Sequence, residues 1–328
     1  MLASCATDDE GDSLLGTGPK AFVEVMIRSR PVRPIMRAHV GDIDIEYELA
    51  GPEDGEPIVL IAGIFQQLSF WPAYFLADLA SEGLRVVVHD NRDIGLSTRE
   101  SRPAPDLKAL SRGDRSGVHY TLSDMAADTV GLIDALGYGS VHVLGHSMGG
   151  AIAQRMAIEF PDRVRSLALF GTFPGDGVNG LSSPKFLAHV LRPVPRDPHE
   201  RWEAALESYR ICIEPEPIDE ALLAAFLRTQ EDRAPNPYMQ CLPAMIASAI
   251  AGTTSSPTHV EALQSLEHPT LVVHGAGDLA VGLDGGRWLA ELIPNARLLV
   301  LEGMGHFPLA PERWAIVAEA VIEHVYKA

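Results

Sequence analysis

A serine between glycines is the residue with the clearest capacity for chemistry in this chain. Residues 141–150 read VHVLGHSMGG, which matches the pattern GxSxG with Gly145, Ser147 and Gly149. In such a pattern a strand turns sharply into a helix, and small residues two positions away let the central residue adopt a strained backbone conformation. The hydroxyl then projects at a helix N-terminus, where free N–H groups favour negative charge on a reacting oxygen. We therefore predict that Ser147 is a nucleophile.

The alternative is a glycine-rich turn that serves packing or binds phosphate. Phosphate binding is disfavoured because no lysine follows as in a GK[ST] loop, and the glycine spacing differs from GxGxxG. The apolar strand pattern before the turn and the small-residue helix AIAQRMA after it favour the catalytic interpretation.

A serine hydroxyl becomes a good nucleophile when a base removes its proton and an acid orients that base. Asp278 comes shortly after the apolar run TLVVHG, and His306 comes shortly after the run RLLVLEG. Because the carboxyl ends of parallel strands meet at one edge of a sheet, we expect both side chains to lie beside Ser147. Asp284 and Asp176 are the reserve candidates for the acid.

Two backbone N–H groups are expected to stabilise the negative oxygen that forms during acyl transfer. One donor follows the nucleophile directly, which makes it Met148. The other should come from the loop after the apolar run IVLIA, where Gly63 lets the backbone approach the substrate. We predict that Ile64 supplies this second N–H.

Other polar residues near these motifs are expected to be structural. His146 precedes the serine on the sharp turn, and His274 ends a predicted strand. The segment DNRDIG contains Asp90, Arg92 and Asp93, which we interpret as an ion-pair network that supports the loops rather than as an acid/base pair.

The elements that must position these residues are short apolar runs separated by helical periods. The runs are rich in Val, Ile and Leu, which is typical of strands buried on both faces of a parallel sheet. An amphipathic strand or hairpin precedes them at residues 39–49. The alternation predicts an α/β fold with a doubly wound sheet. The expected strands are residues 58–62, 85–89, 141–144, 164–170, 271–274 and 298–301, and the expected helices are residues 75–82, 122–136, 151–159, 286–292 and 311–326.

One stretch breaks the alternation and defines the predicted domains. Residues 173–267 contain many prolines and several helical segments but no convincing buried strand, so we predict a helical cap. The cap would interrupt a core made of residues 36–172 and 268–328. Residues 1–35 are expected to form a tail with little intrinsic structure.

Large apolar side chains near the predicted oxyanion donors and in the predicted cap are candidates for a hydrophobic substrate pocket. The alternative for each of them is ordinary core packing. These residues are Phe65, Leu68, Phe70 and Trp71 before the cap, and Tyr209, Tyr238, Met239 and Met245 within it.

Composition excludes several classes of partner. The chain has 328 residues and a formal net charge of −18, which disfavours binding to nucleic acid. Its three cysteines are too few and too scattered for a disulfide framework or a zinc site, so no metal is expected. No apolar run approaches the roughly 18–20 residues that a membrane span needs. We expect a cytoplasmic protein; because residues 2–5, LASC, resemble a lipobox, a lipid anchor at Cys5 is the alternative if the start is misplaced.

Residues 38–326 resemble the α/β-hydrolase superfamily. The segments IAGIFQQ, VVVHDNRDIGLST, YTLSDMAADTVGLIDALG, GHSMGG and GMGH are similar to those of the aclacinomycin methylesterase-like subgroup. The resemblance implies an eight-stranded, mostly parallel sheet, a helical cap and catalysis without a cofactor. It also implies that Ser147, Asp278 and His306 act as nucleophile, acid and base.

Two departures prevent the subgroup's substrate from being carried over. The first oxyanion loop begins with Ala62 and Gly63 where many superfamily members have His and Gly, and His146 stands where the subgroup often has a small or apolar residue. We predict a serine hydrolase that cleaves a carboxylic ester or lactone of a hydrophobic small molecule. The alternatives are C–C bond hydrolysis or perhydrolysis with the same three residues, or a weakly hydrolytic small-molecule receptor.

Overall fold

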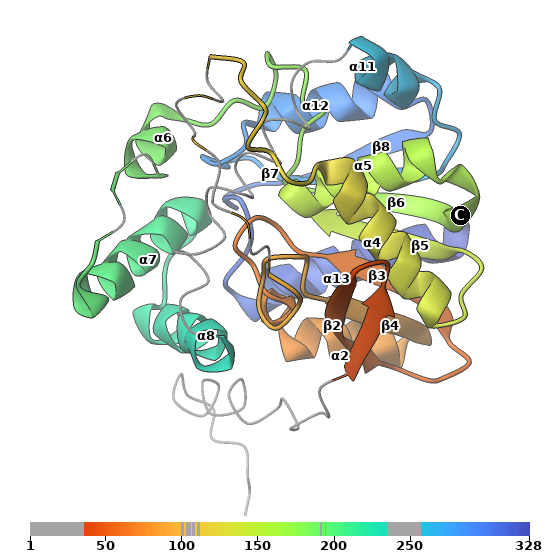
Figure 1. Cartoon of the computed structure of the whole chain (residues 1–328), viewed down its shortest axis with the longest axis horizontal. Helices are drawn as coiled ribbons and strands as arrows, with labels where there is room; N and C mark the ends of the chain where they lie inside the picture. Colours follow the sequence, from red (N-terminus) through yellow and green to blue (C-terminus); the bar gives the residue numbers. More distant parts are fainter. Residues whose placement is uncertain are drawn as a thin grey trace, which may run out of the picture.

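A central eight-stranded sheet organises the protein (Figure 1). The structure is a computed structural model that describes residues 36–99, 102, 106, 109, 112–190, 192–193, 195–234 and 257–328. The strand order is β1-β2-β4-β3-β5-β6-β7-β8. β2 is antiparallel to β1 and β4, and the remaining neighbours in this order are parallel. The predicted α/β fold with a mostly parallel sheet is therefore confirmed. The strands are β1 Met36–Val40, β2 Ile43–Ala50, β3 Glu56–Ile61, β4 Leu84–His89, β5 Val141–His146, β6 Val164–Phe170, β7 Thr270–Gly275 and β8 Ala296–Leu301.

Alternate residues of the central strands face two separate hydrophobic clusters. In β3, Ile58 and Leu60 belong to one cluster, whereas Val59 and Ile61 belong to the other. Successive side chains of a strand point to opposite faces, so a strand covered on both sides has to be apolar throughout. This is why the central strands read as continuous apolar runs.

Helices cover both faces of the sheet (Figure 1). Residues of α2 and α13 contribute to the first cluster, and residues of α4, α5, α11 and α12 contribute to the second. A capping box formed by Thr121 and Asp124 begins α4. The bounds are η1 Leu68–Phe70, α2 Ala73–Ser81, α4 Leu122–Ala135, α5 Met148–Glu159, η2 Pro161–Arg163, α11 Pro257–Gln264, α12 Leu283–Leu292 and α13 Pro311–Lys327.

Further helices lie between β6 and β7 in the sequence. They are α6 Pro184–Val190, α7 Pro198–Ile213 and α8 Glu220–Arg233, and they lie together at one side of the sheet (Figure 1). Asp197 and Asp219 cap the N-termini of α7 and α8 by accepting hydrogen bonds from backbone N–H groups. The division into core and cap stays a prediction, and the predicted tail, residues 1–35, lies outside the described residues.

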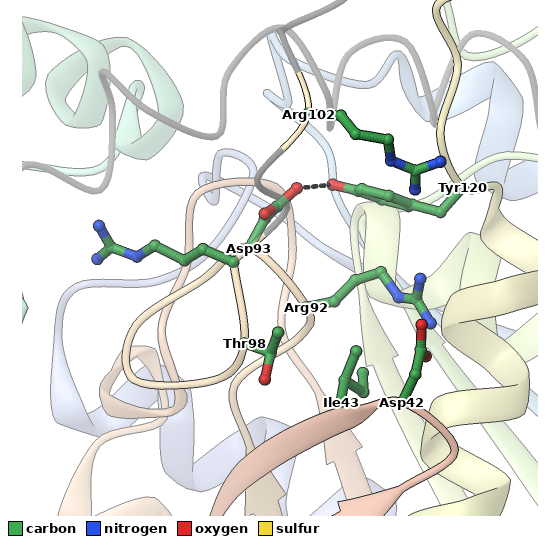
Figure 2. A pocket seen from close by; sticks show the side chains of 8 residues that line it. Asp42, Ile43, Arg92, Asp93, Thr98, Arg102 and Tyr120 are labelled. Atoms are coloured by element: carbon green, nitrogen blue, oxygen red, sulfur yellow. Dashed lines mark hydrogen bonds between the residues drawn. The ribbon is translucent and has the colours of Figure 1, made fainter.

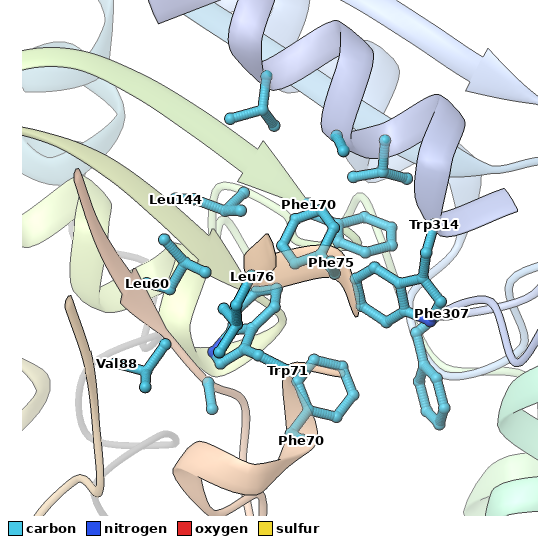
Figure 3. Packing of buried hydrophobic residues seen from close by; sticks show 14 of the residues in the cluster. Leu60, Phe70, Trp71, Phe75, Leu76, Val88, Leu144, Phe170, Phe307 and Trp314 are labelled. Carbon is cyan, nitrogen blue, oxygen red and sulfur yellow. The ribbon is translucent and has the colours of Figure 1, made fainter. Parts of the chain in front are cut away.

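An aromatic group fills the first cluster between the sheet, α2 and α13 (Figure 3). The ring of Trp314 lies 4.9 Å from that of Phe75 and 5.8 Å from that of Phe70, measured between ring centroids. Phe170, at the end of β6, lies 6.1 Å from Trp314. These tilted and edge-on ring pairs pack α13 against Phe70 and against Phe170 at the end of β6.

Truncation of Trp314 should therefore be costly. Trp314 is 2% exposed, so Trp314→Ala leaves a large cavity and should lower the free energy of unfolding by about 3–5 kcal/mol. Ile316, in the same helix, is 45% exposed, and Ile316→Ala should change it by less than about 1 kcal/mol. Urea unfolding measures both values, and equal losses would contradict this packing.

Candidate active site

Ser147 occupies a sharp turn between β5 and α5. Its φ is 54° and its ψ is −120°, a conformation that a residue with a side chain rarely adopts. The Ser147 N–H donates to the Phe170 carbonyl over 2.9 Å, which ties the turn to the end of β6. The predicted strand-to-helix turn is present, and α5 begins at the next residue, Met148.

The glycines of the motif are required by close backbone contacts. A Cβ on Gly149 would lie 2.1 Å from the carbonyl oxygen of Ile61 in β3, and one on Gly145 would lie 2.3 Å from the carbonyl oxygen of Gly149. Such contacts are far inside van der Waals distance, and backbone atoms cannot rotate away as a side chain does. Glycine at these two positions therefore lets the turn pack against the neighbouring strand.

Asp278 and His306 meet in the loops that follow β7 and β8. His306 Nδ1 lies 2.7 Å from Asp278 Oδ2, and both residues are buried. The other carboxylate oxygen accepts hydrogen bonds from Ala280 N and Val281 N, each over 2.8 Å. Because an ionised carboxylate only accepts, the hydrogen bond assigns the proton to Nδ1 and leaves the Nε2 lone pair available as a base.

The charge on Asp278 is held by its neighbours. Burial acts to raise the pKa of this carboxyl, but His306 and His274 outweigh it and hold the pKa well below its usual range. His274 Nε2 lies 3.4 Å from the same carboxylate oxygen that His306 contacts. Asp278 is therefore ionised at neutral pH, as a residue that orients an imidazole must be.

His146, the residue next to Ser147 in the sequence, contacts His306. The rings of His146 and His306 lie 4.7 Å apart between centroids, and His146 Nε2 lies 3.2 Å from the His306 carbonyl oxygen. A Cβ on Gly171 would lie 3.0 Å from the His306 carbonyl oxygen, and Gly171 directly follows Phe170, whose carbonyl accepts from the Ser147 N–H. Among the described residues, no hydrogen bond joins the Ser147 hydroxyl to the His306 ring; catalytic hydrogen bonds are often long before substrate binds.

The reserve acids lie in other environments. Asp176 accepts hydrogen bonds from Val178 N and Asn179 N, each over 2.9 Å, within its own turn. Asp284 lies in the first turn of α12. Within the described residues, neither carboxylate is hydrogen-bonded to His306, so the structure brings Asp278 rather than either reserve to the imidazole.

The loop after β3 lies directly against the nucleophile. A Cβ on Gly63 would lie 3.0 Å from Ser147 Cβ, and the Gly63 N–H donates to Gln66 Oε1 over 2.6 Å. Gln66 Oε1 also lies 3.0 Å from His146 Nδ1, a contact that the sequence motifs did not indicate. In the described part of the chain, Ile64 N and Met148 N donate to no other protein group.

The predicted pocket residues divide by burial. Leu68, Phe70 and Trp71 are fully buried, and Tyr209 is 6% exposed; all belong to the first hydrophobic cluster. Figure 3 shows Phe70 and Trp71 in this cluster. Their position is that of core packing beside the site, the alternative that the sequence left open. Phe65 is half-buried. Tyr238, Met239 and Met245 lie outside the described residues.

The charged residues of DNRDIG have separate partners, as the sequence interpretation expects of a structural network. Arg92 forms a bidentate pair with Asp128, with both distances 2.6 Å. Asp93 accepts a hydrogen bond from the Tyr120 hydroxyl over 2.6 Å (Figure 2). Arg92, Asp93 and Tyr120 line a cavity of about 450 Å³, and none of the predicted catalytic residues is among its lining residues.

In the part of the chain that the structure describes, no three His, Cys, Asp or Glu side chains are grouped so that they could hold a metal ion. No helix within the described residues has the length and apolar character needed to cross a membrane.

Comparison with known proteins identifies the family. Residues 56–312 match the family described as alpha/beta hydrolase fold, and the chain belongs to it. The chain is 27% identical over 281 residues to a protein named "Putative carbamate hydrolase RutD" from Caulobacter vibrioides, covering 82% of this chain and 91% of that protein. It is 28% identical over 295 residues to rhodomycin D methylesterase DnrP from Streptomyces peucetius, covering 80% and 88%.

A solved structure shares the fold. The meta-cleavage product hydrolase CumD from Pseudomonas fluorescens IP01 has 21% sequence identity and a TM-score of 0.70, covering 89% of this chain and 97% of that chain. The resemblance to α/β hydrolases that include methylesterases is thus confirmed. The relatives named here act on different bonds, so the family fixes hydrolysis as the shared chemistry but leaves open which bond is cleaved.

Gly149 lies so close to β3 that a side chain at this position should disturb the turn. Gly149→Ala forces the turn away from Ile61 and should lower the free energy of unfolding by about 1–3 kcal/mol. It should also slow the reaction of Ser147 with a fluorophosphonate probe. Gly139, just before β5, has open space where a Cβ would lie, so Gly139→Ala is the matched control. Equal stability and labelling rates in the two variants would contradict the proposed constraint.

Proposed function

We propose that the protein is a serine hydrolase that cleaves a carboxylic ester or lactone of a hydrophobic small molecule. The observation that carries this proposal is the 2.7 Å hydrogen bond between His306 Nδ1 and Asp278 Oδ2, at the edge of the sheet where Ser147 occupies its strained turn. Membership of the α/β-hydrolase family supports the same chemistry.

In the proposed reaction His306 Nε2 accepts the Ser147 proton as the serine oxygen attacks the substrate carbonyl. The N–H groups of Ile64 and Met148 stabilise the resulting oxyanion. Collapse of this intermediate transfers the proton from His306 to the leaving alcohol and forms an acyl-serine. Water then attacks the acyl group with His306 again as base, which releases the acid and restores Ser147.

Asp278 has an orienting role in this scheme. Its contact with Nδ1 maintains the tautomer in which Nε2 is the base, and its charge stabilises the imidazolium that forms during each half-reaction. The low pKa of Asp278 supports this role, because the carboxylate stays ionised while His306 gains and loses its proton.

The second candidate is C–C bond hydrolysis with the same three residues. It is supported by the similarity in fold to a meta-cleavage product hydrolase. Perhydrolysis and weak hydrolysis by a receptor are further outcomes for the same site. Incubation with matched ester, lactone and vinylogous diketone substrates, followed by product masses, separates them; cleavage of the diketone alone would replace our proposal with the second candidate.

We also propose that residues 173–267 form a cap over the core of residues 36–172 and 268–328. The helices α6, α7 and α8 support this division. A cap of this kind would shape the substrate pocket, for which the half-buried Phe65 is the candidate among the described residues.

Replacement of the nucleophile tests the proposal most directly. Ser147→Ala removes the attacking oxygen and should lower kcat for short p-nitrophenyl esters by a factor of about 10⁴ or more. Labelling by a fluorophosphonate should be lost as well. Ser81→Ala changes an exposed serine and is the control. Turnover at the wild-type rate in Ser147→Ala would refute the assignment.

The assignment of the acid has a separate test. Asp278→Asn keeps the shape of the side chain but favours the wrong imidazole tautomer, and it should lower kcat by roughly 10⁴-fold. Asp284→Asn, the matched change at the reserve acid, should leave kcat within about threefold of wild type, in line with its lack of a bond to His306. Steady-state kinetics on both variants checks this, and the reverse ranking would assign the acid to Asp284.

A further inference from the structure

We infer that Arg233, at the C-terminal end of α8, is a positioning residue that holds the oxyanion loop, residues 63–70, in its working conformation. This inference rests on the proposed function. Arg233 Nη1 donates to Asp90 Oδ2 over 2.7 Å and to Gln67 Oε1 over 2.9 Å, and Nη2 lies 3.4 Å from Glu46 Oε1. The side chain of Arg233 thus contacts the oxyanion loop, strand β2, and Asp90, which directly follows β4.

Asp90 extends the contact to the backbone of the loop. Its Oδ1 accepts from Leu68 N over 2.7 Å, while its Oδ2 accepts from Leu96 N over 2.9 Å as well as from Arg233. Asp90 is fully buried. These hydrogen bonds fix the buried Asp90 carboxylate between Arg233 and the backbone of the oxyanion loop. The position of Arg233 therefore determines the position of Asp90 and, through it, that of the loop.

A second hydrogen bond joins the oxyanion loop to α8. Gln67 Nε2 donates to the Gln230 carbonyl in α8 over 2.8 Å, and Gln67 is fully buried. The next residue toward the predicted donor, Gln66, binds Gly63 N with its side chain. Arg233 therefore binds Gln67, and the adjacent residue Gln66 binds Gly63, the residue that precedes Ile64.

Charge explains why an arginine is needed here. The carboxylates of Asp90 and Glu46 both lie within reach of Arg233 and are 0% and 3% exposed. Without the guanidinium, Asp90 would be left buried beside another acidic residue. Arginine has a planar, forked guanidinium group that contacts Asp90, Gln67 and Glu46 at the same time. The ammonium of a lysine is a single point of charge and cannot contact all three in this way.

The expected effect is on transition-state stabilisation rather than on substrate binding. If the loop shifts, Ile64 N no longer aims at the oxyanion, whereas the ground-state contacts of the substrate change less. We expect Arg233→Met to lower kcat for a short p-nitrophenyl ester by about tenfold or more, with KM within about threefold of wild type. Arg233→Lys should recover part of the lost rate.

Paired inhibitors separate positioning from general loosening of the site. A trifluoromethyl ketone forms a tetrahedral oxyanion with the nucleophile, whereas the methyl ketone with the same alkyl chain binds mainly as a ground-state analogue. In Arg233→Met the inhibition constant of the trifluoromethyl ketone should rise about tenfold, and that of the methyl ketone should stay within about twofold.

Further variants keep the test decisive if Arg233→Met does not fold. Gln67→Met is similar in shape, removes both ties between the loop and α8 that use Gln67, and leaves no buried charge unpaired, so it should shift the inhibitors in the same direction. Arg210→Met is the matched control, because Arg210 in α7 pairs with Glu220 at an exposed site. Thermal unfolding checks that each variant is folded.

The outcomes discriminate between the inference and the function on which it rests. Equal weakening of both inhibitors, or no change in either relative to Arg210→Met, would overturn the role of Arg233 while wild-type ester hydrolysis stands. A wild-type protein that neither hydrolyses esters nor reacts at Ser147 would overturn the proposed function, and the role of Arg233 with it.

Discussion

The strained turn at Ser147 is the constraint on which the rest of the structure depends. A residue with a side chain in this conformation costs on the order of 1–3 kcal/mol, so it persists only where its surroundings hold it. Here β6 binds the Ser147 N–H, and Gly149 packs against the end of β3. The turn therefore depends on β3, β5 and β6 lying side by side, as their parallel pairing and two-sided burial hold them.

The loop that carries His306 is held from a different direction. The His306 N–H donates to the Cys212 carbonyl at the end of α7 over 2.6 Å, and a Cβ on Gly305 would lie 2.3 Å from the same oxygen. α8 contacts the oxyanion loop through Arg233 and Gln230. The helices between β6 and β7 thus contact two of the loops that surround the nucleophile, in addition to any contact they make with substrate.

Much of this arrangement was predictable because its causes are local. The strain at Ser147 requires glycines at fixed positions, and two-sided burial requires apolar runs, so both leave a pattern in the sequence. The approach of Asp278 to His306 followed from the rule that parallel strands end at one edge. The resemblance to a known superfamily supplied the number of strands, which the residue pattern alone did not.

The contacts that escaped prediction depend on tertiary structure. Arg233 and Asp90 are 143 residues apart, and no local pattern pairs them. The Cys212 carbonyl that binds His306 is a backbone group, so its role is independent of residue type. The complete burial of Phe70 and Trp71 likewise depends on packing against α13. β6 and β7 are parallel, so the connection between them leaves one edge of the sheet and returns at the opposite edge. Such a crossover can lengthen at modest entropic cost, because that cost grows only slowly with the number of residues. Helices can therefore vary within the crossover, provided that the contacts of Arg233 and Cys212 with the loops around Ser147 are retained.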